Sequence, residues 1–146
     1  MDFATEVASL AKRSLAASQQ AMTEEATKTS VIMPFIRALG FDIFNLDEVT
    51  PEFIADVGTK KGEKVDFVLK IDGKNAILIE TKPISMALGA NQHSQLFRYF
   101  TVTDARIAIL TNGRDFWFYS DSEAANKMDN KPFLMLDAVT PDNSSI

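Results

Sequence analysis

The chain contains no cysteine and only one histidine among its 146 residues. Without cysteine there is no disulfide framework and no thiolate metal site. A glycine-rich phosphate loop, a serine nucleophile elbow and a Cys/His pair are also missing. His93, the single histidine, has no partner at metal-ligand spacing, so we interpret it as a surface or packing residue. These absences exclude disulfide cross-links, thiolate metal sites and Cys/His catalysis, and they argue against a P-loop nucleotide site and a serine nucleophile elbow.

Long apolar runs are missing as well. No uncharged apolar stretch is long enough to cross a bilayer. The first residues carry acids early and lack the basic start and apolar core of a secretory signal. We therefore expect a cytoplasmic protein that contacts no membrane.

Positive charge is in deficit. Fifteen Lys and Arg residues face twenty Asp and Glu residues, which gives a net charge of −5. Tight passive binding to DNA draws most of its affinity from phosphate neutralisation, so this balance argues against a simple DNA-binding module. It is less restrictive for an enzyme whose acids bind a metal, or for a module within a larger DNA-binding assembly.

What the chain does contain is typical of one globular α/β domain. Hydrophobic residues make up 46% of it, including eleven phenylalanines. Hydrophobic spacing predicts helices over 3–20, 23–40 and 88–100, and strands over 53–57, 64–71, 75–84, 106–110, 116–119 and 132–136. Pro34 predicts a kink in the second helix, and Gly40 its end. This order favours a mixed central sheet flanked by helices.

We divide the chain into a packing helix over 1–22, a main domain over 23–140 and a polar tail over 141–146. The tail either leads into a further C-terminal region or is an ordinary frayed terminus.

Two acids and a lysine lie on two neighbouring apolar strands. Glu80 and Lys82 share a strand face because side chains alternate. The apolar residues of both strands are odd-numbered, so they form one core face only if odd residues pair with odd ones. Asp66 then joins Glu80 and Lys82 on the other face. An Asp72-Gly73 turn of type I with a bulge at Gly73 would give that register.

Such a cluster suits a divalent cation. Two neighbouring carboxylates repel each other, and a cation removes that cost. The expected ligands are the carboxylates of Asp66 and Glu80 and the main-chain carbonyl of Thr81, and oxygen ligands favour Mg²⁺ or Mn²⁺. Lys82 would activate water or neutralise a phosphoryl transition state. The simpler alternative is a hairpin with charges on its solvent face.

The spacing Asp66 … Glu80-Thr81-Lys82 across a hairpin resembles the PD-(D/E)xK nuclease motif, with Val65 in place of its proline. More specifically, residues 23–120 resemble the N-terminal nuclease region of type I restriction enzyme R subunits and their stand-alone relatives. The segments that carry this resemblance, besides the hairpin, are Glu24-Glu25-Ala26-Thr27-Lys28, Ile32-Met33-Pro34, Leu39-Gly40-Phe41-Asp42, Gln95-Leu96-Phe97-Arg98-Tyr99-Phe100 and Leu110-Thr111-Asn112-Gly113.

The resemblance implies a restriction-endonuclease-like core in α-β-β-β-α-β order, with an extra N-terminal helix. It implies a Mg²⁺-dependent deoxyribonuclease that acts on DNA, with other subunits or a C-terminal region as partners. A catalytically silent module of the same fold, which binds nucleic acid or protein within a larger assembly, is the alternative.

The resemblance also adds residues to the site. A helix acid near the metal is implied, either Glu24 or Glu25. We favour Glu25 because it shares a helical stripe with core residues, although an acidic first turn is also favourable by itself.

Gln95 and Tyr99 match a Q-x-x-x-Y element, in which Gln95 would contact a phosphate or water and Tyr99 would support it and lie in the nucleic-acid-binding region. The alternative is an ordinary packing helix. Arg98, Lys64, Lys60 and Lys61 are candidates for backbone contacts, and for the three lysines a solvated turn is the more economical interpretation.

Overall fold

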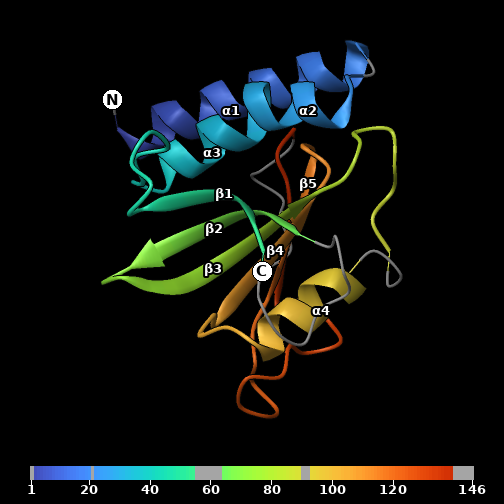
Figure 1. Ribbon diagram of the computed structural model, residues 1–146. Helices are drawn as coiled ribbons and strands as arrows, with labels where there is room; N and C mark the ends of the chain where they lie inside the picture. The colour runs from blue at the N-terminus through green and yellow to red at the C-terminus, as the bar shows by residue number, and fades with distance from the viewer. Residues whose placement is uncertain (1, 21, 55–63, 90–92, 140–146) are drawn as a thin grey trace.

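A six-stranded mixed β-sheet with helices against both faces forms the framework of the computed structural model, which describes residues 2–20, 22–54, 64–89 and 93–139 (Figure 1). The helical segments are α1 (Phe3–Gln20), α2 (Glu24–Thr27), η1 (Lys28–Ile32), α3 (Met33–Ala38) and α4 (Ser94–Thr101). The strands are β1 (Val49–Phe53), β2 (Val65–Ile71), β3 (Lys74–Thr81), β4 (Ile107–Thr111), β5 (Asp115–Tyr119) and β6 (Leu134–Asp137).

The strands follow one another across the sheet in chain order, and all neighbouring pairs are antiparallel except β3 and β4. Helix α4 lies in the β3–β4 connection, because a parallel pair needs a crossover. The predicted α/β class with a mixed sheet and an extra N-terminal helix is confirmed. None of the described helices combines the length and apolarity that crossing a bilayer requires.

Both faces of the sheet are covered. Odd residues such as Phe67, Leu69 and Ile79 pack with α1, η1 and α3 in one core. Even residues such as Val68 and Leu78 pack with α4 in a second core. The alternative of a solvent-facing charged side is therefore wrong, since the face that carries Asp66 and Glu80 is also buried.

The β2–β3 hairpin has the expected parity but a different turn. Phe67 pairs with Ile79, so odd residues do pair with odd ones near the acids. Asp72 and Gly73 both have positive φ, of 52° and 78°, as a two-residue type I′ turn requires. Going from this turn towards the acids, the register shifts by one residue between Lys70 and Leu69, because β3 forms a bulge there. The prediction of a bulge at Gly73 is wrong, but the bulge within β3 produces the predicted pairing of odd with odd residues.

The second predicted helix is interrupted before Pro34. The side chain of Thr23 caps it by accepting a hydrogen bond from Ala26 N–H. A π-helical turn, η1, then spans Lys28–Ile32, and Met33 N–H donates to Lys28 O. Pro34 lacks an N–H and its ring crowds the preceding turn, so a wider turn accommodates it. Gly40, at φ 98°, ends the helical run as predicted.

Some element bounds differ from those predicted. Helix α4 begins at Ser94 instead of residue 88, and β1 spans Val49–Phe53, earlier than predicted. Residues 55–57 of the predicted strand and the 141–146 tail lie outside the described residues.

Candidate active site

Asp66 and Glu80 lie side by side at the end of the β2–β3 hairpin. Asp66 Oδ2 accepts a hydrogen bond from Thr81 N–H at 2.7 Å, and Glu80 Oε1 accepts one from Asp66 N–H at 3.3 Å. The two carboxyl side chains are only 7% and 8% exposed. Each acid thus accepts a hydrogen bond from the main chain of the neighbouring strand, which orients the pair.

Glu80 is the acid whose ionisation is most disturbed. Burial, together with the negative charge of Asp66, raises the pKa of Glu80 to about 8, and the nearby Lys82 opposes this shift. Lys82 Nζ lies 3.5 Å from Glu80 Oε2, and its side chain is 22% exposed. The structure therefore brings the three residues of the predicted motif together, with Lys82 facing solvent.

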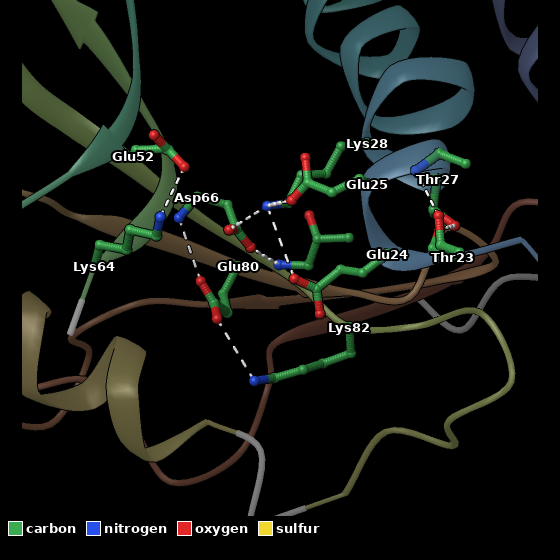
Figure 2. A network of polar contacts seen from close by, with 12 residues as sticks. Thr23, Glu24, Glu25, Thr27, Lys28, Glu52, Lys64, Asp66, Glu80 and Lys82 are labelled. Atoms are coloured by element: carbon green, nitrogen blue, oxygen red, sulfur yellow. Dashed lines mark hydrogen bonds and ion pairs between the residues drawn. The ribbon is translucent and has the colours of Figure 1, made fainter. Parts of the chain in front are cut away.

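Lys28 is a member of this cluster that the sequence analysis did not single out. Its Nζ lies 2.7 Å from Asp66 Oδ1, 2.9 Å from Glu25 Oε1 and 3.8 Å from Glu24 Oε2. Burial disfavours the charge, but hydrogen bonds and attraction to Asp66 and Glu25 outweigh it and raise the pKa of Lys28 above its ordinary value. Figure 2 shows Lys28 between Asp66 and the two helix acids, and Lys82 beyond Glu80. The spacing of Lys28 from Glu24 and Glu25 was the available signal.

The expected orientation of Glu25 is wrong. Its side chain is 81% exposed, whereas that of Glu24 is 39% exposed. The stripe that placed Glu25 towards the core assumed an unbroken α-helix. The π-helical turn holds one extra residue, so Glu24 takes roughly the orientation that a regular helix would give Glu25. Judged by burial, Glu24 is therefore the better candidate for the helix acid, although both acids contact Lys28.

Gln95 contacts the main chain two residues before Asp66. Its amide donates a hydrogen bond to the main-chain carbonyl of Lys64, near the start of β2. Tyr99 is completely buried and meets Phe53 edge-on at 6.1 Å between ring centroids. The expectation that Tyr99 contacts nucleic acid is thus corrected, because it has no exposed surface. Its supporting role for Gln95 stays a prediction.

Two of the basic candidates, Lys64 and Arg98, belong to the described residues. Lys64 Nζ forms an exposed ion pair with Glu52 at 2.7 Å. Arg98 is half-buried in the last turn of α4, and Lys60 and Lys61 lie outside the described residues. His93 packs edge-on against Tyr119, at 5.7 Å between centroids, as expected of a packing residue. No structural observation assigns the basic residues to a nucleic-acid surface.

The donor set fits a hard divalent cation. The cluster contains four carboxylates and two ammonium groups, those of Glu24, Glu25, Asp66, Glu80, Lys28 and Lys82. When all six groups are ionised, two negative charges are in excess, and one divalent cation would neutralise them. The buried Thr81 Oγ1 has no hydrogen-bond partner among the described residues, but strand alternation places this side chain on the face opposite Glu80 and Lys82, so only the main chain of Thr81 belongs to the donor set. Within those residues, however, no three acidic or histidine side chains are grouped as metal ligands. A metal here would rely on two carboxylates, a main-chain carbonyl and water.

Comparison with known proteins gives one finding. No curated protein and no solved structure matches the chain significantly. The family model described as type I restriction enzyme R protein N terminus matches residues 23–132, which include α2, the β2–β3 hairpin, α4 and the two following strands. Because this match covers most of the chain and contains every element of the site, the protein belongs to the family of type I restriction enzyme R protein N-terminal domains.

Proposed function

We propose that this chain is a metal-dependent endonuclease domain that hydrolyses DNA phosphodiester bonds. The observation that carries the proposal is the buried Asp66–Glu80 pair, fixed by main-chain hydrogen bonds and accompanied by Lys82. Membership in the restriction enzyme family supports the same function. A buried carboxyl group with a strongly raised pKa, here that of Glu80, is typical of functional sites when it lies beside a second acid.

Each residue has a distinct role in this proposal. Asp66, Glu80 and the Thr81 carbonyl would hold Mg²⁺ or Mn²⁺, which supplies Lewis-acid catalysis when bound. The partly exposed Lys82 ammonium would orient the attacking water or neutralise the charge that develops on the phosphate. Glu24 or Glu25 would complete the acidic rim.

Residues around the pair would contact the substrate. Gln95 would position a phosphate or water near the start of β2, and Arg98 and Lys64 would contact the DNA backbone. DNA is the proposed substrate, and other restriction subunits or a C-terminal region are the proposed partners, since the net charge of −5 gives the domain little affinity of its own.

A silent binding module is the second candidate. Both oxygens of Asp66 already have protein partners, Thr81 N–H and Lys28 Nζ, so the fold is complete without a metal. If the chain is silent, calorimetric titration with Mn²⁺ will show no binding to the wild-type protein.

We predict that Lys82→Ala lowers Mg²⁺-dependent nicking of supercoiled plasmid at least about 100-fold, because the charge beside the reacting phosphate is lost. The variant should fold normally, since Lys82 is partly exposed and contacts a single acid. Lys74→Ala, at the exposed hairpin turn, is the matched control and should nick like wild type. Equal activity of Lys82→Ala and wild type contradicts the assigned role.

A further inference from the structure

Lys28 fills a position at which three carboxylates converge. Its side chain is only 10% exposed, and the distances to Asp66 Oδ1 and Glu25 Oε1 are 2.7 and 2.9 Å, with Glu24 Oε2 at 3.8 Å. A buried cation with three carboxylate neighbours occupies the kind of position that a small metal ion takes. The location therefore requires a positive charge, and the chain provides one itself.

Both oxygens of Asp66 already have a protein partner. Its Oδ2 is held by Thr81 N–H at 2.7 Å, and its Oδ1 is held by Lys28. Each oxygen keeps a second lone pair, but a metal ligated by either one would lie close to the Lys28 ammonium group. Two cations at one buried carboxylate repel each other strongly, because the surroundings screen little. Lys28 and the metal of the proposed function therefore compete.

Lys28 has an alternative place to go. Glu24 and Glu25 lie one helical turn before it, and their side chains are 39% and 81% exposed. These hydrated acids can keep the ammonium group at the rim after it leaves Asp66, and the flexible lysine stem permits that movement. The carboxylates of Glu24 and Glu25 would thus still hold Lys28 when a metal is bound to Asp66.

We propose that Lys28 is an internal counter-cation, a positioning residue that pairs with Asp66 and orients it in the metal-free protein and moves to Glu24 and Glu25 when a divalent cation binds. This inference rests on the metal site of the proposed function. It goes beyond that function by giving Lys28 control over metal affinity. Removing its charge should tighten metal binding, whereas removing an ordinary structural residue would weaken it.

The first test needs no variant. Lysines of the full-length wild-type chain are acetylated with acetic anhydride, with and without saturating Mg²⁺, and the rate at each lysine is read by mass spectrometry. Lys28 should react at least about tenfold faster with Mg²⁺, because binding shifts it from the buried to the exposed position. Lys64, already exposed and paired with Glu52, should not change.

The second test compares Mn²⁺ affinities by calorimetry. Lys28→Met should bind Mn²⁺ about tenfold more tightly than wild type, since the competing charge is gone. Lys74→Met, at the exposed hairpin turn, removes a single exposed charge and serves as the control, with affinity unchanged. The counter-cation role alone is overturned if wild type binds Mn²⁺ but two results fail: the acetylation rate of Lys28 does not change with Mg²⁺, and Lys28→Met binds Mn²⁺ with wild-type affinity. Absence of Mn²⁺ binding in both proteins overturns the metal site itself, so the two failures are distinguishable.

Discussion

Replacing Glu80 with glutamine should stabilise the metal-free protein at alkaline pH while abolishing metal-dependent cleavage. The folded protein holds a proton on Glu80 up to a pKa of about 8, whereas the unfolded chain releases it near the ordinary value of 4.5. Wild-type stability therefore falls as the pH rises from 4.5 through 8, because the unfolded state binds fewer protons over that window. Glutamine, which resembles the protonated acid, does not suffer this loss.

The expected gain is on the order of 5 kcal/mol at pH 9 and vanishes below pH 4.5. Urea denaturation of both proteins in EDTA from pH 4 to 9 measures it. Asp115→Asn is a comparison variant, because burial also raises the pKa of Asp115, away from the metal candidates. A Glu80→Gln protein that is less stable than wild type across the whole range would contradict the buried, proton-holding state. Opposite effects on stability and activity are typical of functional residues.

Asp66→Asn should have the largest destabilising effect of any single change at the site. The substitution leaves the buried Lys28 ammonium without its closest partner, at 2.7 Å. Removing one member of a buried ion pair costs about 3 to 5 kcal/mol. Lys28 keeps its contact with Glu25, so we expect a loss of stability near the lower end of that range. Cleavage should be lost as well, because Asp66 is a proposed metal ligand.

A double variant separates this charge effect from lost packing. Lys28→Met with Asp66→Asn leaves no unpaired buried charge between these positions, so it should recover part of the stability that Asp66→Asn loses. Glu52→Gln, which breaks the exposed pair with Lys64, should leave the stability nearly unchanged and serves as the control. If the double variant is as unstable as the sum of the two single variants, the pair is not coupled as the structure indicates.

The sequence predicted the hairpin register because hydrophobic alternation fixes which residues can share a buried face. Phe67 and Ile79 had to face one core, and Asp66 and Glu80 followed. The turn was not predictable from the same pattern. Asp72-Gly73 suits both turn types, and the bulge that restores parity lies within β3, where no glycine or proline marks it.

The preference for Glu25 over Glu24 and the omission of Lys28 have a different reason. Periodicity arguments assume an α-helix, and a π-helical turn changes the phase of every residue before it. Pro34 signalled an irregularity but not its form. The ion pair between Lys28 and Asp66 joins residues far apart in the chain, so only the packing of η1 against the sheet reveals it.

The most direct test of the central claim is a calorimetric titration of the wild-type chain with Mn²⁺ at pH 7, in buffers of different ionisation enthalpy. We predict one site per chain, with the release of close to one proton, because a metal requires the Glu80 carboxylate to be ionised although its pKa is about 8. Asp66→Asn and Glu80→Gln should show no binding. A folded wild-type protein that binds no Mn²⁺, or a Glu80→Gln protein that binds it equally well, would contradict a metal site between Asp66 and Glu80.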